Sequence, residues 1–503
     1  MNFSDLFILA IPETIIMATA LLVLAADLVA LRDLDRRFRF IIGSMIAGIG
    51  CAGAIVWMLI SHAHMNAFSG MLVVDPVTQC VKISLLALTA FTILLSVDSD
   101  FTEHVGEYLA LILFAAVGMM FLVSAEDILM IFISLELTSL SLYILAAFNK
   151  RDIKSAEASL KYFLFGGMSA AFTLFGLSLV YGLSGSTNLP EIVTALANRG
   201  FDSLLVVAIV MVIIGFGFKI AAVPFHLWAP DAYQGAPTPS AAFIASGSKV
   251  ASFFIFAKVM AVGFTEGGIP AGFGMAGSAA WHAYNPGWVP LLAIIAALSI
   301  ILGNLVAIVQ SSVRRLLAYS AIAHAGYMLL AILSHNNQSL ASLIYYAVTY
   351  GFTTIGAFGV VAVVEQGTGG EKLTDFAGLS RRAPLVSFCM MIFMLSLAGI
   401  PPLAGFFGKF YVFTAAIQSG AANLGLLWLV ILAVAMSAVS LFYYLQVLKQ
   451  IYVNNAEPSA KPLKPSVLTQ VVLLLLAALV ILLGCAPNLL LGWILAAIGS
   501  GPA

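Results

Sequence analysis

The sequence has little charge. Only 9% of its 503 residues are Asp, Glu, Lys or Arg, whereas a typical soluble domain carries about 25%. Hydrophobic residues make up 62% of the chain, and this excludes a disordered protein, because disorder requires low hydrophobicity. The formal net charge of −1 indicates no nucleic-acid partner, since such binding depends on positive charge. The composition instead predicts a protein that lies in a lipid bilayer.

Cysteine is also scarce. The chain has four cysteines, which lie far apart inside apolar segments and form no CxxC pair: Cys51, Cys80, Cys389 and Cys485. A disulfide framework, a zinc site or an iron–sulfur cluster needs clustered thiols. The sequence also lacks the P-loop signature for nucleotide phosphates. We therefore expect no metal and no cofactor in this chain.

Long apolar runs, in contrast, follow one another along the whole chain. Each is long enough to cross a bilayer as a helix, which takes about 18 or more residues. The first run lacks a basic region before it and exceeds the apolar stretch of a signal peptide, so we expect it to remain as a helix. The sequence thus predicts an all-α polytopic membrane protein of about fourteen spans. The predicted limits are 6–30, 40–61, 77–97, 107–125, 127–149, 158–183, 203–223, 236–262, 288–310, 316–334, 340–364, 384–417, 422–452 and 466–495.

The positive charges between the spans test this count. They cluster after the first, fifth, ninth, eleventh and thirteenth spans, which all end on one side of the membrane. The clusters are Arg32, Arg36, Arg37 and Arg39; Lys150, Arg151 and Lys154; Arg314 and Arg315; Lys372, Arg381 and Arg382; and Lys449, Lys461 and Lys464. Because positive loops stay inside, that side is predicted to be cytoplasmic. Only Arg199 falls on the other side, and both termini are predicted to be periplasmic in a bacterial plasma membrane.

Prolines interrupt two of the predicted helices. These two are the spans whose prolines we take as breaks: Pro224 directly follows the predicted limit of the seventh span, and Pro401 and Pro402 lie within the twelfth. Proline removes a backbone donor and clashes with the preceding turn, and in a bilayer the freed groups need other partners. Each span is therefore either an ordinary kinked helix or, as we favour, a broken one.

The positions of the two breaks predict an internal repeat. The broken helix is the fourth of five in residues 107–262 and again in residues 288–452. Two successive units of five helices have opposite orientations in the membrane, which is the pattern of inverted-repeat transporters. Residues 1–106 would form a three-helix segment before the repeats, and 466–495 a last helix after them.

Ionisable residues inside membrane spans are costly and are candidates for function. A lysine removed from water releases its proton more readily, and a row of such groups bridged by water would relay protons. For Lys161, near the start of its span, snorkelling to the surface is the alternative. The principal candidates are Glu136, Lys161, Lys219, Lys249 and Lys409.

Other polar residues are weaker candidates. Lys82 and Lys258 lie near span ends, where snorkelling is the favoured interpretation. His226 and His324 are possible relay groups, because imidazole titrates near neutral pH, although a lone histidine is more often a packing residue. Tyr319 is a further possible relay, and Asp231 is expected to cap or orient the helix after the first break.

Several segments resemble one known family. KIAAVPFHLWAPDAYQGAPTPSAAF, which starts at Lys219, looks like the signature of the antiporter-like subunits of NADH–quinone oxidoreductase (complex I) and their Mrp antiporter relatives. SLELTSLSLYILAAF, RRLLAYSAIAHAGYMLL and LAGIPPLAGFFGKFYVF are similar to the subunit N branch of that family. The resemblance covers essentially the whole chain.

The resemblance implies a mechanism and partners. By it, Glu136 pairs with Lys219, Lys161 tunes that pair, Lys249 is the central relay and Lys409 lies on the exit side. The family pumps protons while other subunits carry FMN and iron–sulfur clusters and oxidise NADH. The partners implied are the antiporter-like subunit M, the small subunits K and J, and the lipid bilayer.

Two other functions stay open from the residues alone. A secondary antiporter that exchanges sodium for protons would need the same broken helices and buried charges. A structural subunit of a hydrogenase-type membrane complex is the second alternative. What co-purifies with the chain would distinguish among the three.

Overall fold

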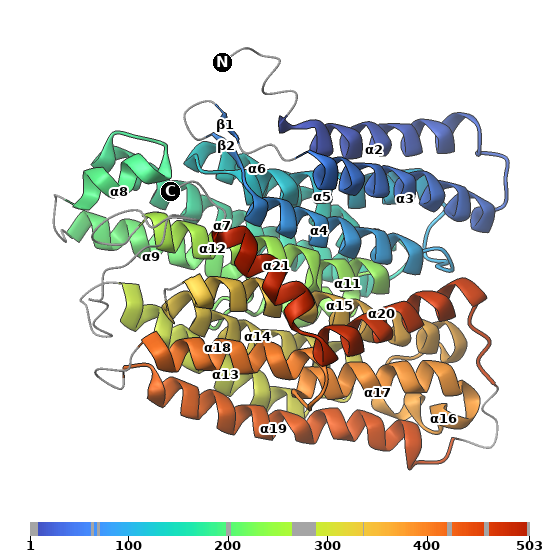
Figure 1. Cartoon of the computed structure of the whole chain (residues 1–503). Helices are drawn as coiled ribbons and strands as arrows, with labels where there is room; N and C mark the ends of the chain where they lie inside the picture. The colour runs from blue at the N-terminus through green and yellow to red at the C-terminus, as the bar shows by residue number, and fades with distance from the viewer. Residues whose placement is uncertain are drawn as a thin grey trace.

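The structure is a computed structural model that describes residues 9–61, 65–67, 71–197, 203–263, 288–334, 337–419, 425–456 and 462–499. Long helices lie side by side along one common direction (Figure 1). One small antiparallel hairpin, β1 (Met65–Ala67) with β2 (Leu72–Val74), joins two of them. The predicted all-α polytopic fold is therefore confirmed.

The first half of the chain builds the part drawn in blue to green in Figure 1. Asp75 starts α4 with a capping box, in which Asp75 and Thr78 exchange hydrogen bonds between side chain and backbone. The helices are α2 (Ile11–Val29), α3 (Arg36–Ile60), α4 (Pro76–Leu95), α5 (Val105–Ser124), α6 (Ile128–Ala146), α7 (Ile153–Ser184), α8 (Leu189–Ala197), α9 (Ser203–Lys219), α10 (Trp228–Gly235), α11 (Thr238–Ala245) and α12 (Gly247–Gly263).

The second half packs against the first along its length (Figure 1). Its central helix α15 contacts α11 and α12 of the first half as well as α14, α17 and α18. The helices are α13 (Trp288–Ile308), α14 (Val313–Ser334), α15 (Asn337–Thr368), η1 (Leu373–Phe376), α16 (Leu379–Arg382), α17 (Pro384–Ala398), α18 (Ala404–Ser419), α19 (Leu427–Tyr452), α20 (Val467–Cys485) and α21 (Asn488–Gly499).

The predicted spans can be traced in this set of helices. Within the described residues, 12 candidate spans are long and apolar enough to cross a membrane. The pairs α9/α10 and α17/α18, each in two halves, supply the remaining two of the fourteen predicted spans. The predicted starts at residues 6 and 422, both chain ends, Arg199 and Lys461 lie outside the described residues.

The first break separates α9 from α10. The chain leaves the helix after Lys219, passes Ala221 at a φ of 58° and a cis Val223–Pro224 bond, and becomes helical again at Trp228. Side chains form hydrogen bonds with backbone groups at the break, because a bilayer offers these groups no water. The Trp228 indole donates to the Phe218 carbonyl at 3.0 Å, and the Val223 N–H donates to Ser299 at 2.9 Å.

The second break separates α17 from α18 and has a similar form. Gly399 takes a φ of 86°, which L side chains disfavour, and a cis Pro401–Pro402 bond follows. The Gly405 N–H at the start of α18 donates to the Ser396 hydroxyl at 3.1 Å. Both proline-containing spans are therefore broken helices, as favoured above, and not kinked ones.

Two further interruptions were not predicted. The predicted eighth span divides at Ser246 into α11 and α12, and the fourteenth divides at Ala486 into α20 and α21. At the second of these, the Tyr345 hydroxyl donates to the free Leu483 carbonyl at 2.7 Å. The end of α20 lies directly against the loop of the second break, because Gly484 faces the backbone of Pro402–Ala404.

This close approach predicts a strong effect of one methyl group. A Cβ at Gly484 would overlap the Pro402 carbonyl and the Ala404 N–H. We expect Gly484→Ala to lower the free energy of unfolding by about 1–3 kcal/mol or more, since overpacking against backbone forces it to shift. Thermal unfolding of the purified complex in detergent would measure this. Gly492→Ala, in α21 with open space around the added Cβ, is the control and is expected to leave the Tm unchanged or raised.

Candidate functional site

Lys219 lies at the first break, as the last residue of α9. Its ammonium group donates a hydrogen bond to the Ser139 hydroxyl of α6 and lies 5.9 Å from the ring centroid of Tyr143. Glu136 is one turn before Ser139 on α6 and is near enough for its charge to act on Lys219. The two described side chains nevertheless form no direct ion pair, and the hydrogen-bond partner of Lys219 is Ser139.

Lys249 lies in the first turn of α12 and is only 2% exposed. Its Nζ donates to the Ala321 carbonyl of α14 at 2.6 Å and lies 5.7 Å from the ring centroid of Tyr350 on α15. Among the described residues, no carboxylate pairs with it. One carbonyl and one aromatic face are weak compensation for a buried charge, so the site offers a charged lysine few partners.

His324 lies one turn beyond Ala321 on α14 and is buried. Both ring nitrogens contact tyrosine hydroxyls: Nδ1 lies 2.7 Å from that of Tyr346, and Nε2 lies 3.2 Å from that of Tyr444. The Tyr444 hydroxyl also shares a hydrogen bond with Ser320. A histidine bonded through both nitrogens can accept a proton on one and give a proton from the other.

Lys409 belongs to α18 but reaches back to the end of α17. Its Nζ donates to the Leu397 and Ala398 carbonyls at 3.0 and 3.1 Å and to the Ser437 hydroxyl of α19 at 2.9 Å. These carbonyls are the free acceptors at the C-terminal end of a helix, where the helix dipole favours a positive charge. Lys219 is thus the last residue of the first half of one broken helix, and the Lys409 ammonium group lies at the C-terminal end of the first half of the other.

Aromatic rings connect the central groups. The Tyr350 ring lies 5.0 Å from the His324 ring and beneath Lys249. On the other side, the Tyr327 ring lies 5.7 Å from His324 and 5.2 Å from the Lys409 Nζ. His324 therefore lies between Lys249 and Lys409, and the predicted relay role of this histidine has a geometry that suits it.

Lys161 lies in a different environment. Its Nζ is 2.6 Å from Glu157 and 2.7 Å from Asp231, and Asp231 also pairs with Arg315 at 2.7 Å. The side chain is 38% exposed. Lys161 makes no direct contact with Glu136 or Lys219 in the described structure, so any tuning of that pair would act at a distance.

Two other predicted relay residues are less clearly placed. His226 is buried in the first break and its Nδ1 has no hydrogen-bond partner among the described residues. Tyr319 is half-buried on α14 and packs against the apolar core. The structure brings neither of them into contact with Lys219, Lys249 or Lys409.

The snorkelling interpretation of Lys82 and Lys258 is wrong. Lys82 is 2% exposed and pairs with Glu13 of α2 at 2.6 Å, while Lys258 is fully buried and pairs with Glu126 at 2.9 Å. Burial was missed because a position near a span end was equated with access to the surface. The signal was available: each acid lies near the predicted periplasmic end of its segment, as its lysine does, and opposite charges at one depth favour pairing.

Comparison with known proteins places this arrangement in a family. Residues 125–437 match the family model described as NADH:quinone oxidoreductase/Mrp antiporter, TM. The chain is 53% identical over 502 residues to NADH-quinone oxidoreductase subunit N 2 of Acidobacterium capsulatum, covering 98% of this chain and 99% of that one. The chain belongs to this antiporter-like family.

Solved structures of the family agree with the fold. A chain of respiratory complex I from Thermus thermophilus superposes with a TM-score of 0.77 at 32% identity, over 96% of this chain and 98% of that one. A chain of the archaeal membrane-bound sulfane sulfur reductase superposes with a TM-score of 0.83 at 24% identity, over 98% and 97%, which supports the fold alone. The same fold thus occurs in more than one kind of respiratory membrane complex.

Proposed function

We propose that this chain is a membrane subunit of a proton-translocating NADH–quinone oxidoreductase and that it carries protons along Lys219, Lys249, His324 and Lys409. The observation that carries the proposal is the placement of His324 between two buried lysines, with a tyrosine ring on each side. Among the described residues no group of ligands for a metal ion is present. The chemistry that this chain offers is the movement of protons.

The coupling of this chain to the rest of the complex begins at Glu136. This residue is half-buried on α6 and is flanked by the exposed side chains of Ile133 and Leu137. A carboxylate in this position is costly in contact with lipid, so we propose that a neighbouring membrane subunit packs against it. A change of charge in that neighbour would alter the balance between Glu136 and Lys219, because Coulomb interactions are strong where water is excluded.

The proton then passes inward through the chain. When Lys219 gains or loses its charge, the next buried group responds, because like charges in a low-dielectric region destabilise each other. Lys249 gives its proton toward His324, and His324 gives one toward Lys409. The free carbonyls of α17 and the Ser437 hydroxyl hold the protonated Lys409 before release.

The energy source lies in other subunits. By family resemblance, FMN and iron–sulfur clusters in partner subunits take electrons from NADH to quinone. The proposed partners in the membrane are the antiporter-like subunit M and the small subunits K and J. This assignment rests on the subunit-N-like relatives and not on any site within this chain.

The orientation and the internal repeat are also part of the proposal. The chain is a multi-pass membrane protein, and we place it in the bacterial inner membrane with both termini periplasmic. Figure 1 shows the start of α2, the hairpin β1–β2 and α8 at one end of the bundle, with α16 at the other. Residues 107–262 and 288–452 would be inverted repeats, with support from the two breaks that each hold a lysine.

Substitution of the first pair tests the proposal. In the assembled complex in vesicles, we expect Lys219→Ala or Glu136→Ala to lower the number of protons moved per NADH, because the first transfer loses its donor or its counter-charge. Lys449→Ala, at the exposed end of α19, is the control and should leave the ratio intact. Unchanged pumping in Lys219→Ala would remove that lysine from the path.

The antiporter alternative has its own test. The family description names Mrp antiporters as well, so the chain could be expressed without a peripheral arm and assayed for exchange of sodium against protons. We expect no exchange. Co-purification of an NADH-oxidising arm supports the proposal, whereas co-purification of a hydrogenase would replace it.

A further inference from the structure

A polar cavity of about 480 Å³ lies at the end of the molecule that is predicted to face the cytoplasm. The cavity is lined by the connections that follow α4, α6, α10 and α15, which end the predicted third, fifth, seventh and eleventh spans. Arg314 follows the predicted ninth span. All five of these spans are predicted to end on the cytoplasmic side. Its charged lining residues are Asp100, Asp152, Lys154, Arg314, Glu365 and Glu371.

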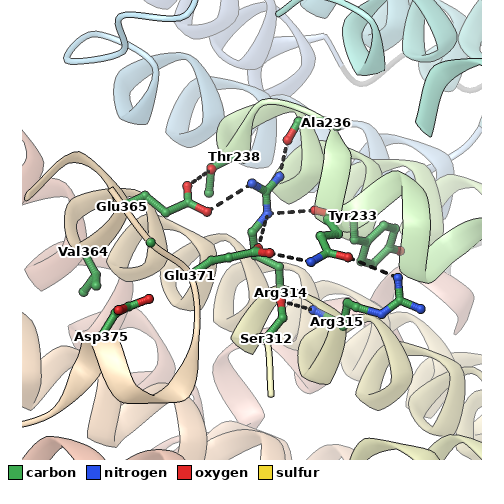
Figure 2. Close-up of polar contacts among 12 residues, drawn as sticks. Tyr233, Ala236, Thr238, Ser312, Arg314, Arg315, Val364, Glu365, Glu371 and Asp375 are labelled. Atoms are coloured by element: carbon green, nitrogen blue, oxygen red, sulfur yellow. Dashed lines mark hydrogen bonds and ion pairs between the residues drawn. The ribbon is translucent and has the colours of Figure 1, made fainter. Parts of the chain in front are cut away.

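Arg314 lines this cavity, and its guanidinium bonds to residues of several helices (Figure 2). It is buried, and its guanidinium donates to the Tyr233 carbonyl at 2.9 Å and to the Ala236 carbonyl, both at the end of α10. It also pairs with Glu365 at 3.1 Å and lies 3.7 Å from Glu371. One side chain of α14 thus connects the end of the first broken helix to α15.

Glu365 binds both Arg314 and the start of α11. One oxygen accepts from Arg314, and the other accepts from the Thr238 hydroxyl at the start of α11. Glu365 therefore lines an open cavity while it fixes the start of the helix pair that carries Lys249. Protonation of Glu365 from the cavity would remove the nearer of the two carboxylate charges that pair with Arg314.

A single face of α15 leads from this carboxylate to the central lysine. Tyr350, Thr354, Phe358, Ala362 and Glu365 follow at intervals of four, four, four and three residues, so they form one stripe. The stripe spans about 22 Å at 1.5 Å per residue. It begins at the cavity, where Ala362 is part of the lining, and ends at Tyr350, whose ring lies beneath Lys249.

One buried hydroxyl lies beside this stripe without a protein partner. Tyr233 is fully buried, its ring centroid is 6.1 Å from that of Phe358, and its hydroxyl has no hydrogen bond among the described residues. A buried hydroxyl rarely stays unpaired. It therefore marks a place where a proton carrier such as water is accepted between Arg314 and Lys249.

We propose that this cavity is the cytoplasmic entrance for the protons and that the Arg314–Glu365 pair is its gate, with Glu365 as the group that takes up the proton. The inference rests on the proposed function and adds to it where the path begins. The charges that face Glu365 are those of Arg314 and, across the cavity, of Glu371, Asp100, Asp152 and Lys154.

The test blocks the cavity after the complex has assembled. Ala362→Cys is prepared in the full complex, and inverted membrane vesicles, whose outer face is the former cytoplasmic side, are treated with a membrane-impermeant maleimide. We expect labelling at Cys in position 362 and a loss of proton translocation by this chain relative to treated wild type. Thr368→Cys, exposed at the same end of α15 and outside the lining, should be labelled without this loss.

Two further variants examine the gate itself. Glu365→Gln keeps a hydrogen-bond partner for Thr238 but cannot take up a proton. We expect it to lower the number of protons moved per NADH while quinone reduction continues. Glu365→Asp should restore part of this ratio. Glu103→Gln, which changes an exposed carboxylate at the same end that pairs with Arg36, should change nothing. Complete labelling at position 362 with full pumping, or no labelling from the cytoplasmic side, overturns the entrance. If the entrance is overturned in this way but Lys249→Met still stops proton translocation, the proposed function stands and only the entrance is rejected.

Discussion

Replacing Lys249 with methionine is expected to reduce proton flow through this chain about 100-fold or more, the contribution typical of a positioned proton-transfer group. The reason is its place between the entrance side of the path and His324, with only the Ala321 carbonyl and the Tyr350 ring as partners. Methionine fills a similar volume without a titratable group. Acidification of vesicles that hold the assembled complex, after addition of NADH, is the measurement.

A second substitution separates proton transfer from the need for a charge. Lys249→Arg keeps a positive charge but does not release its proton near neutral pH, so it should fail as Lys249→Met does. Lys449→Met, at the exposed end of α19, is the matched lysine control and should behave as wild type. Wild-type acidification by Lys249→Arg would show that this position needs only a fixed charge.

The second large effect concerns stability. Glu13→Gln is expected to lower the free energy of unfolding by about 3–5 kcal/mol, because it leaves Lys82 charged and buried without its partner. The two groups are each 2% exposed and 2.6 Å apart, and neither is on the proposed path. The yield and the Tm of the purified complex would report this change.

The paired substitution is the control for this prediction. Glu13→Gln combined with Lys82→Met removes both charges and should recover most of the lost stability, since replacing a whole buried pair is often close to neutral. A double variant as unstable as the single one would mean that the helix contact, and not the ion pair, had been damaged.

Much of the architecture could be predicted from the sequence. Apolar runs identified the spans, and Pro224, Pro401 and Pro402 located the two breaks, because proline acts locally on the backbone. The division of the last span at Ala486 was not predicted, although Pro487 lies next to it. The cause there is a tertiary contact of Gly484 with the second break, which no local pattern records.

The candidate site was predicted less completely. The lysines were found because a charge inside an apolar run is conspicuous. Their surroundings depend on residues far away in the sequence, such as Ser139 beside Lys219 and Ser437 beside Lys409. The role of Arg314 in lining the cavity was hidden for the same reason, since it was counted only among the positive residues of a loop.

The pair of Lys258 with Glu126 has a consequence for biosynthesis. A lysine in an inserting helix is costly, by about 2.5–3.5 kcal/mol at the helix centre, and Lys258, although near the end of its span, is fully buried. Its acid precedes it in the chain, in the connection between α5 and α6. Because synthesis runs from the N-terminus, Glu126 is synthesised and reaches the membrane surface before α12 leaves the ribosome. Glu126 is therefore in place to pair with Lys258 as α12 inserts, and without this acid the inserting lysine would lose its counter-charge.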